Sequence, residues 1–523
     1  MRQLIFVVFI GLLVSLTSCR NDFEFQPSTG NLEFSRDTVY LDTVFTNIGS
    51  STYTLKVYNK SDTDISIPAV RLGKGQQSKY RMTVDGMTGN DNRIFNNVEL
   101  LANDSLYIFI ETTAGIADAN PDDFLYTDQI VFEQGSNEQK VELVTLIQDA
   151  YFIFPKRNEG IYDLVDFGFD AEGNTTQVRG RNLEENHPDN GNEYEWGNDK
   201  PYVVYGFASV PNGKTLTVNA GARIHFHAES GIIVQEGGTL SVEGALSTPG
   251  TLDNEVIFES DRLEPGFADT PGQWGFVYLR QGSTNHSIDY LTIKNATVGL
   301  YVENNFGNPM TINNTQIYNA SVVGILARFA RIDGFNIVIN TRTRGIGALA
   351  CTYGGSYNFT HCSFNNESSS STQFAVIVDN FYLDTNNQPV AFDLTQANFN
   401  NCIIYGANSR QLLLNKDDSK LYNFKFNNCL IRFNNQTAPF NTLPQYDFTN
   451  STFYEGNLIA QNFSDFLPDF LDPANNKLVI GMDSAAKGTA DFTFSNGTTD
   501  ISGFPRATPS DIGAYNAILF EEE

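Results

Sequence analysis

The sequence predicts an all-β protein whose larger part is a β-solenoid. A degenerate unit recurs about every two dozen residues, with Asn295, Asn319 and Asn340 at spacings of 24 and 21 residues. A period of this size indicates a solenoid, in which each repeat buries its face only against its neighbours. Short alternating apolar runs that end in Asn or Gly favour strands over helices. With 523 residues the chain is also too long for one ordinary core, so we expect a second domain.

Residues 1–18 have the pattern of a bacterial lipoprotein signal peptide. Arg2 precedes an apolar run over residues 4–16, and small residues precede Cys19. This segment resembles a lipobox, which implies that Cys19 is lipidated and becomes the mature N-terminus, with residues 19–30 as a tether. Acyl chains would then anchor the protein in a membrane. The alternative is an ordinary secretory signal with a chance cysteine.

The charge of the chain limits its partners. Lys and Arg number 33 against 61 Asp and Glu, so the net charge is −28. A strongly acidic surface argues against nucleic acid and against anionic lipid headgroups as partners. It also disfavours a polyanionic substrate unless calcium bridges the two. We therefore expect no nucleic-acid partner and no cofactor, with calcium left open.

Residues 31–150 predict a β-sandwich. Alternating runs at 38–45, 52–58, 105–110, 129–132 and 140–146 are separated by turn residues at short intervals. The run 53–67 resembles the opening of immunoglobulin-like domains of the abnormal-spindle and Hydin type. This resemblance implies a spacer or interaction module, and we assign no chemistry to it.

Residues 151–199 are irregular and polar, and we expect a linker that covers the N-terminal end of the solenoid. Acidic residues gather in 182–200. Calcium binding is conceivable because carboxylate oxygens are dense there, but the spacing of an EF-hand is absent. We expect a solvated loop.

Residues 200–460 predict the stacked coils, and 461–523 predict a final coil and a C-terminal cap. The segments Thr215–Val218, Gly238–Val242 and Trp274–Leu279, with Asp511–Tyr515 near the end, resemble right-handed parallel β-helices of the pectin-lyase-like type. Equivalent positions of such coils form ladders about 4.8 Å apart. Asn295, Asn319 and Asn340 are therefore expected to form a structural ladder at one corner.

Four cysteines fall within the solenoid, at Cys351, Cys362, Cys402 and Cys429. The last three each precede an apolar or small strand residue and follow His or Asn, which places them at equivalent points of successive coils. We expect stacked buried thiols, although an exported protein also permits disulfides.

Candidate chemical groups are few. His225 and His227 lie two apart on a strand, so their side chains share one face and could hold a metal. Arg223 beside them disfavours a cation, and we expect both imidazoles to face solvent.

A second candidate is a cluster of arginines. The pair Arg328 and Arg331 and the pair Arg342 and Arg344 lie about one coil apart, so the two pairs could be neighbours. The cluster could bind a carboxylated or sulfated glycan, or it could only compensate nearby acidic charge. The resemblance to pectin-lyase-like enzymes implies a basic residue that abstracts a proton, and Asp379 could serve as acid, base or calcium ligand. Exposed Tyr and Phe could stack on sugar rings, but the sequence cannot choose among 41 Phe.

Two functions remain open. The first is a cell-envelope lipoprotein without catalysis, whose β-helix binds a glycan or a surface protein. The alternative is a polysaccharide lyase or glycoside hydrolase that acts on an acidic glycan. The sequence contains no nucleophile elbow, phosphate loop or zinc motif, which favours the first. The layout resembles lipoproteins of Bacteroidota, which implies the outer membrane, on its periplasmic or extracellular face.

Overall fold

The computed structural model describes residues 24–28, 30–121, 124–133, 138–169, 174–248, 251–305, 309–342, 345–370 and 372–521. Cys19 and Arg344 lie outside the described residues, as does the whole signal segment. The chain divides into two compact units, Met1–Asp149 and Ala150–Glu523.

The protein is all-β. The helical segments of the described part are single 3-10 turns: η1 (Gly75–Gln77), η2 (Ile116–Asp118), η3 (Pro265–Phe267), η4 (Pro444–Tyr446), η5 (Pro473–Asn475) and η6 (Phe492–Phe494). Among the described residues, no helix has the length and hydrophobicity of a membrane span.

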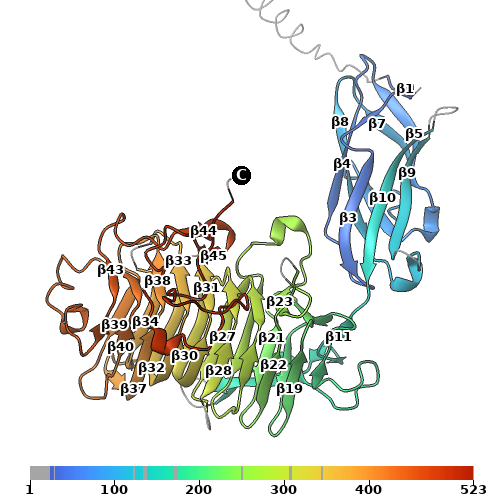
Figure 1. Ribbon diagram of the computed structural model, residues 1–523. Coiled ribbons are helices and arrows are strands. Elements are labelled where there is room, and N and C mark those ends of the chain that lie inside the picture. Colours follow the sequence, from blue (N-terminus) through green and yellow to red (C-terminus); the bar gives the residue numbers. More distant parts are fainter. Residues whose placement is uncertain are drawn as a thin grey trace, which may run out of the picture. The chain divides into compact units, whose positions relative to one another are not determined.

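The first unit consists of two sheets around one core (Figure 1). One sheet has the order β1-β5-β9-β10-β3, with β7 on β5, and the other has the order β2-β4-β8-β6. Strands such as β8 alternate between buried and exposed residues, which gives each sheet one apolar face. The strands are β1 (Gln26–Pro27), β2 (Glu33–Phe34), β3 (Thr38–Phe45), β4 (Tyr53–Tyr58), β5 (Ile65–Leu72), β6 (Tyr80–Val84), β7 (Ile94–Leu100), β8 (Ser105–Thr112), β9 (Leu125–Glu133) and β10 (Gln139–Gln148).

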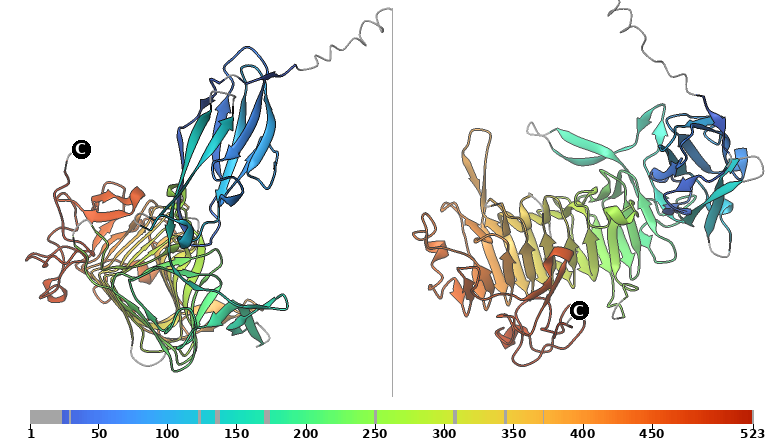
Figure 2. Two further views of the ribbon diagram at one scale, coloured as in Figure 1. Left: turned by 90° about the vertical axis from the view of Figure 1, so that its right-hand side faces the viewer. Right: turned by 90° about the horizontal axis from the view of Figure 1, so that it is seen from above.

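The second unit is a stack of parallel coils with the architecture of a β-helix, seen end-on in Figure 2 (left). Its strands form three faces. Face A is an 11-stranded sheet of β11 (Tyr151–Ile153), β17 (Tyr202–Val204), β20 (Arg223–Phe226), β23 (Val256–Ser260), β26 (Leu291–Lys294), β29 (Gln316–Tyr318), β31 (Val338–Thr341), β33 (Ser363–Asn366), β38 (Ile403–Gly406), β41 (Leu430–Arg432) and β43 (Leu458–Ala460).

Faces B and C belong to one sheet that bends. Its two longest strands, β30 (Val323–Phe335) and β32 (Gly347–Thr360), cross the bend and serve both faces. Face B also holds β15 (Thr175–Asn182), β18 (Phe207–Val210), β21 (Gly231–Val234), β24 (Trp274–Leu279), β27 (Ala296–Glu303), β34 (Phe374–Asp379) and β39 (Leu412–Asn415). Face C also holds β16 (Glu195–Trp196), β19 (Thr215–Asn219), β22 (Thr239–Glu243), β25 (Ser287–Asp289), β28 (Met310–Asn313), β37 (Leu394–Asn400), β40 (Lys425–Asn427) and β42 (Tyr454–Glu455).

In the described part of this unit, four short antiparallel pairs of strands lie outside the parallel stacking of the coils. They are β12 (Arg157–Asn158) with β13 (Ile161–Tyr162), β14 (Leu164–Phe169) with β15, β35 (Phe381–Leu383) with β36 (Pro389–Ala391), and β44 (Phe470–Asp472) with β45 (Lys477–Ile480).

Apolar ladders fill the solenoid. On face A, Ile224 pairs with Phe258, Phe258 with Ile293, and Ile293 with Ile317, and all four side chains are fully buried. Because parallel pairing without a shift puts equivalent residues one above another, each coil buries the apolar side chains of the next.

The expected asparagine ladder splits in two. Asn295 and Asn319 both have positive φ, and Asn319 Nδ2 donates to Asn295 Oδ1 at 3.3 Å. Asn340 instead lies within β31, where it pairs with Tyr318, and its Oδ1 accepts from Asn365 Nδ2 at 2.9 Å. The spacing of 21 residues therefore places Asn340 one position before the site equivalent to Asn319.

The four solenoid cysteines are buried free thiols. Cys362, Cys402 and Cys429 each precede a strand of face A in successive coils, and Cys402 N donates to Cys429 Sγ at 3.4 Å. They act here as small core side chains.

The C-terminal segment runs along the flank of several coils on face A. Asn340 Nδ2 donates to Pro473 O at 2.8 Å, and Arg506 Nη2 donates to Asn336 Oδ1 at 2.8 Å. The amide of Asp491 donates to Asn401 Oδ1 at 2.8 Å. Side-chain amides and a guanidinium thus fix this segment across the stack, in addition to its apolar contacts with strands β38, β41 and β43.

Candidate functional site

Unusual side chains gather where face B turns into face C. The turn lies between the two halves of β30, between the two halves of β32, and between β34 and β37. We call this group the corner site, which comprises Arg328, Phe329, Arg331, Tyr353, Asp379, Tyr382 and Phe392.

The backbone of the corner site is strained. Phe329 has φ of 47° and Tyr353 has φ of 60°, a region that bulky residues rarely adopt. Tyr357, fully buried beneath them, holds the turn in place: its Oη accepts from Ala330 N at 3.2 Å and donates to Gly354 O at 2.9 Å. Strain of this kind is concentrated at functional sites and persists only where the surroundings enforce it.

Four aromatic rings form a cluster at the surface of the corner site. Tyr353 lies 4.8 Å from Tyr382 and 6.3 Å from Phe392 between ring centroids, and Phe329 lies 5.3 Å from Phe392. Tyr382 comes from the β35–β36 hairpin, which projects from the coils (Figure 2, right). Phe329 remains 40% exposed and Tyr382 36% exposed, so their rings are available to a ligand.

Arg328 is held between tyrosines. Its Nη1 donates to Tyr301 Oη at 2.8 Å, and its guanidinium carbon lies 5.2 Å from the ring centroids of both Tyr301 and Tyr353. These contacts combine a hydrogen bond with cation–π attraction. Tyr301 in turn stacks on Tyr278 at 4.4 Å, so the ladder of rings continues along face B.

Asp379 ends β34 beside these rings. Its Oδ1 accepts from Tyr353 N at 2.8 Å. Burial raises the pKa of Asp379 to about 6, and backbone N–H groups and the charge of Arg328 offset only part of that increase. A carboxyl group with such a pKa can exchange protons near neutral pH.

A cavity of about 460 Å³ adjoins the rings. Phe329, Arg331, Asn304, Asn305 and Asp393 contribute to its lining. Arg331 is exposed, and its amide donates to Asn305 Oδ1 at 2.8 Å, which ties this part of β30 to the turn of the preceding coil. The cavity thus combines one aromatic ring, that of Phe329, with polar and charged groups, as binding sites for polar small molecules do.

The structure separates the predicted arginines. Arg328, Arg331 and Asp379 come to one corner, but Arg342 follows β31 on face A, where it donates to Ala474 O. Between Arg331 and Arg342 the chain passes along faces C and A, so the two positions lie at different corners of the coil. The expected grouping of Arg342 with Arg328 is wrong for this reason.

The two histidines do not share an environment. His227 is exposed, and its Nδ1 lies 2.8 Å from Asp261 Oδ2, whereas His225 is buried, with Nδ1 3.2 Å from Ser260 O. Burial lowers the pKa of His225. We expected both to face solvent, which is wrong for His225 because residues of β23 cover it. Over the described ranges no group of three or more His, Cys, Asp or Glu side chains could hold a metal ion.

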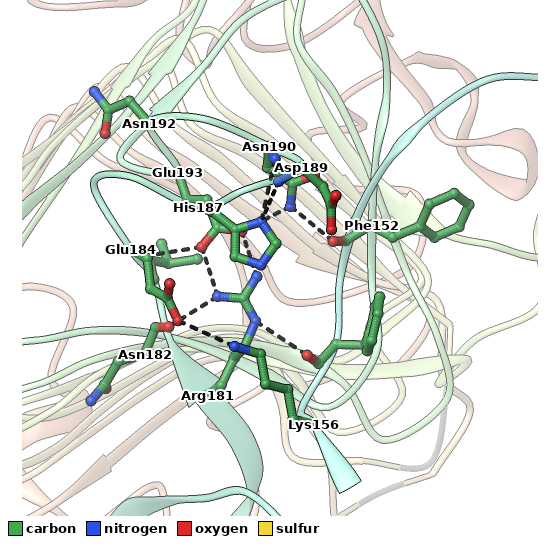
Figure 3. Close-up of polar contacts among 12 residues, drawn as sticks. Phe152, Lys156, Arg181, Asn182, Glu184, His187, Asp189, Asn190, Asn192 and Glu193 are labelled. Atoms are coloured by element: carbon green, nitrogen blue, oxygen red, sulfur yellow. Dashed lines mark hydrogen bonds and ion pairs between the residues drawn. The ribbon is translucent and has the colours of Figure 1, made fainter.

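The acidic segment near the N-terminal end of the solenoid is only partly a solvated loop. Glu193 is buried, and its carboxylate accepts two hydrogen bonds from Arg181, one of them 2.6 Å from Nη1 to Oε2 (Figure 3). Asn190 Nδ2 and Glu184 N also donate to the Glu193 carboxylate, at 2.8 and 3.0 Å. Sequence reasoning missed this network because Arg181 lies just before the acidic run.

No protein-family model and no curated protein matches this chain. Among solved structures, it is similar to the crystal structure of the E. coli chaperone DraB, with 16% identity over 27% of this chain and a TM-score of 0.16. The match covers 61% of that chain, which is less than two thirds of its length. A similarity this weak carries no argument about fold or function.

Proposed function

We propose that this protein is a lipid-anchored protein of the cell envelope whose solenoid binds a glycan at the corner site. The observation that supports it is the cluster of partly exposed rings, Phe329 and Tyr382 above all, beside Arg328 and a polar cavity. Flat aromatic faces fit the apolar faces of sugar rings, and the polar groups around them can bond sugar hydroxyls.

The energetic argument rests on preorganisation. Tyr357 and the bulged register fix the turn before any ligand arrives. When the rings are already in position, binding does not have to order a loop of the protein, so less conformational entropy is lost on binding. On this proposal, the strained backbone at Phe329 and Tyr353 serves binding, because it holds the aromatic rings exposed to the ligand.

The anchoring part of the proposal rests on Cys19 and the segment before it. Lipidation of Cys19 would hold the chain on the outer membrane, the first unit would act as an immunoglobulin-like spacer, and the right-handed solenoid would present the corner site. Cys19→Ala is expected to release the protein from the membrane fraction. A Cys19→Ala protein that remains in that fraction after a carbonate wash would contradict lipid anchoring.

Glycan binding is tested by calorimetry against a panel of neutral and acidic polysaccharides. Tyr382→Ala is expected to weaken binding about tenfold, or roughly 1.4 kcal/mol, because it removes one exposed ring of the cluster. Tyr40→Ala is the matched control, since Tyr40 is an exposed tyrosine of the first unit. Equal affinities for the two variants, or no binding across the panel, would refute the proposal.

A second candidate function is cleavage of an acidic glycan, and the raised pKa of Asp379 near the charge of Arg328 favours it. A base that accepts a proton near neutral pH, with a cation to attract a uronate, suits a lyase or a hydrolase. Incubation with acidic polysaccharides, followed by absorbance of unsaturated uronates and release of reducing ends, distinguishes a lyase from a hydrolase. Product that Asp379→Asn abolishes would favour catalysis over binding alone.

A further inference from the structure

A second cavity, of about 650 Å³, lies beside the β14–β15 hairpin near the N-terminal end of the solenoid. Exposed amide side chains from three different strands or turns contribute to its lining, namely Asn182, Asn212 and Gln281. Leu164 and Phe169 of the hairpin, 51% and 69% exposed, contribute an apolar wall. Amide and apolar side chains thus line this cavity together, as Asn304, Asn305 and Phe329 do in the cavity at the corner site. None of the residues of this second cavity stands out in the sequence.

Both cavities open on the same edge of the solenoid, where face B meets face C. A ladder of backbone hydrogen bonds connects them. It runs from Gly213 N to Gly237 O (3.0 Å), from Gly237 N to Gly282 O (2.9 Å), from Gly282 N to Asn304 O (3.1 Å) and from Asn304 N to Arg328 O (2.9 Å). Gly282 lines the second cavity and Asn304 lines the first, so the two cavities meet at neighbouring rungs.

The two hairpins stand at the two ends of the stretch of this edge that holds the cavities. β14–β15 stands beside the second cavity, and β35–β36 carries Tyr382 of the corner site. In the right-hand view of Figure 2 both hairpins project from the same side of the coils. The ladder and its next pair, Arg328 with Thr352, make five steps, or about 24 Å at about 4.8 Å a step.

We propose that the ligand is a linear glycan that lies along this edge, parallel to the solenoid axis, and that the second cavity binds its far end. This inference rests on the glycan-binding function proposed above and adds the length and the direction of the ligand. About five sugar units cover the distance, since one unit is about as long as one step of the ladder.

The charges of the second cavity select a neutral end. Its one arginine, Arg280, donates to Gln235 Oε1, and Asp166 Oδ1 accepts from Gln177 Nε2 at 2.9 Å, so both groups already have partners. Glu236 adds a negative charge to the lining, which repels a carboxylated or sulfated unit. Hydroxyl and acetamido groups match the amides of Asn212 and Gln281.

The test is a length series. Cello-, xylo- and manno-oligosaccharides from disaccharide to hexasaccharide, with oligogalacturonides of the same lengths, are titrated into the full chain by calorimetry. We expect at least one neutral series to gain about tenfold in affinity between trisaccharide and hexasaccharide. The double variant Asn212→Ala/Gln281→Ala should abolish that gain and leave trisaccharide affinity unchanged, whereas Tyr382→Ala should weaken both lengths. Gln77→Ala, an exposed amide of the first unit, is the control.

The outcomes separate the two proposals. Binding of trisaccharide and hexasaccharide with equal affinity, or a hexasaccharide gain that survives the double variant, overturns the inference and leaves glycan binding intact. Tighter binding of hexagalacturonate than of every neutral hexasaccharide overturns the assignment of a neutral end. Absence of binding by every series overturns glycan binding and the inference together.

Discussion

Two carboxylates of the solenoid that lie near arginines, the buried Glu193 and the half-buried Asp379, behave in opposite ways. In the N-terminal network Arg181 donates directly to Glu193, and the two side chains are 6% and 1% exposed. Burial alone would raise the pKa of Glu193, but the bonds from Arg181 and Asn190 lower it below its ordinary value. At the corner site Arg328 bonds Tyr301 instead, and burial raises the pKa of Asp379 to about 6.

The difference shows what separates a structural ion pair from a group free to act. Glu193 has its oxygens occupied by Arg181, Asn190 and Glu184, so it is satisfied and remains charged. Asp379 receives backbone N–H groups but, among the described residues, no hydrogen bond from Arg328. Asp379, whose pKa is about 6 and which lies beside exposed rings, can gain or lose a proton when a ligand binds. Glu193 stays charged and only stabilises the N-terminal end of the solenoid.

The largest expected effect separates the two arginines. Arg181→Met should lower the free energy of unfolding by about 3–5 kcal/mol, because it leaves Glu193 charged and unpaired in the interior. Arg328→Met should cost only about 1 kcal/mol, from lost cation–π contacts. Urea unfolding followed by tryptophan fluorescence measures both, since Trp196 and Trp274 report the second unit alone. Equal losses in the free energy of unfolding for the two variants would show that Arg181 is no more important to stability than Arg328.

A smaller effect concerns the sign of the pH dependence. Asp379 has a raised pKa, so the folded state holds its proton more tightly, and stability falls as pH rises from about 4 to about 6. Asp379→Asn should therefore stabilise the second unit at pH 8 relative to pH 4. Glu193 has a lowered pKa, so its contribution is present above the unfolded value and is lost as pH falls. Glu193→Gln should accordingly destabilise more at pH 8 than at pH 4. The measurement is the free energy of unfolding of each variant and of the unchanged protein at pH 4 and pH 8. If the effect of both substitutions changed in the same direction between the two pH values, the comparison would be contradicted.

The smallest expected effect concerns strain at the corner site. Phe329→Ala and Phe329→Gly both remove the ring, but only glycine relieves the positive φ. The glycine variant should be more stable than the alanine variant by about 1 kcal/mol. The same pair at Phe426, a buried core residue whose φ is not positive, should favour alanine instead. Equal stabilities of the two Phe329 variants would show that the turn relaxes and stores no strain.

The corner site could be predicted only in part. The sequence already placed Arg328 and Arg331 in one short stretch and pointed to Asp379. Phe329, Tyr353, Tyr382 and Phe392 could not be singled out, because most aromatic residues of a solenoid belong to its core. The available signal was a break in the repeat: 14 residues separate the end of β34 from the start of β37, where β30 and β32 cross the same corner without interruption. An insertion of this kind marks a departure from pure stacking.

By itself the sequence determined the all-β class, the repeat and the parallel stacking. Apolar residues at a regular spacing have one efficient way to leave water, which is to lie above their equivalents in the next coil. Only the tertiary structure decided which rings are exposed, which arginine pairs with a carboxylate, and that the two cavities share one edge. Those properties depend on where each turn falls around the coil and on what covers it, and residues far apart in the chain supply the cover.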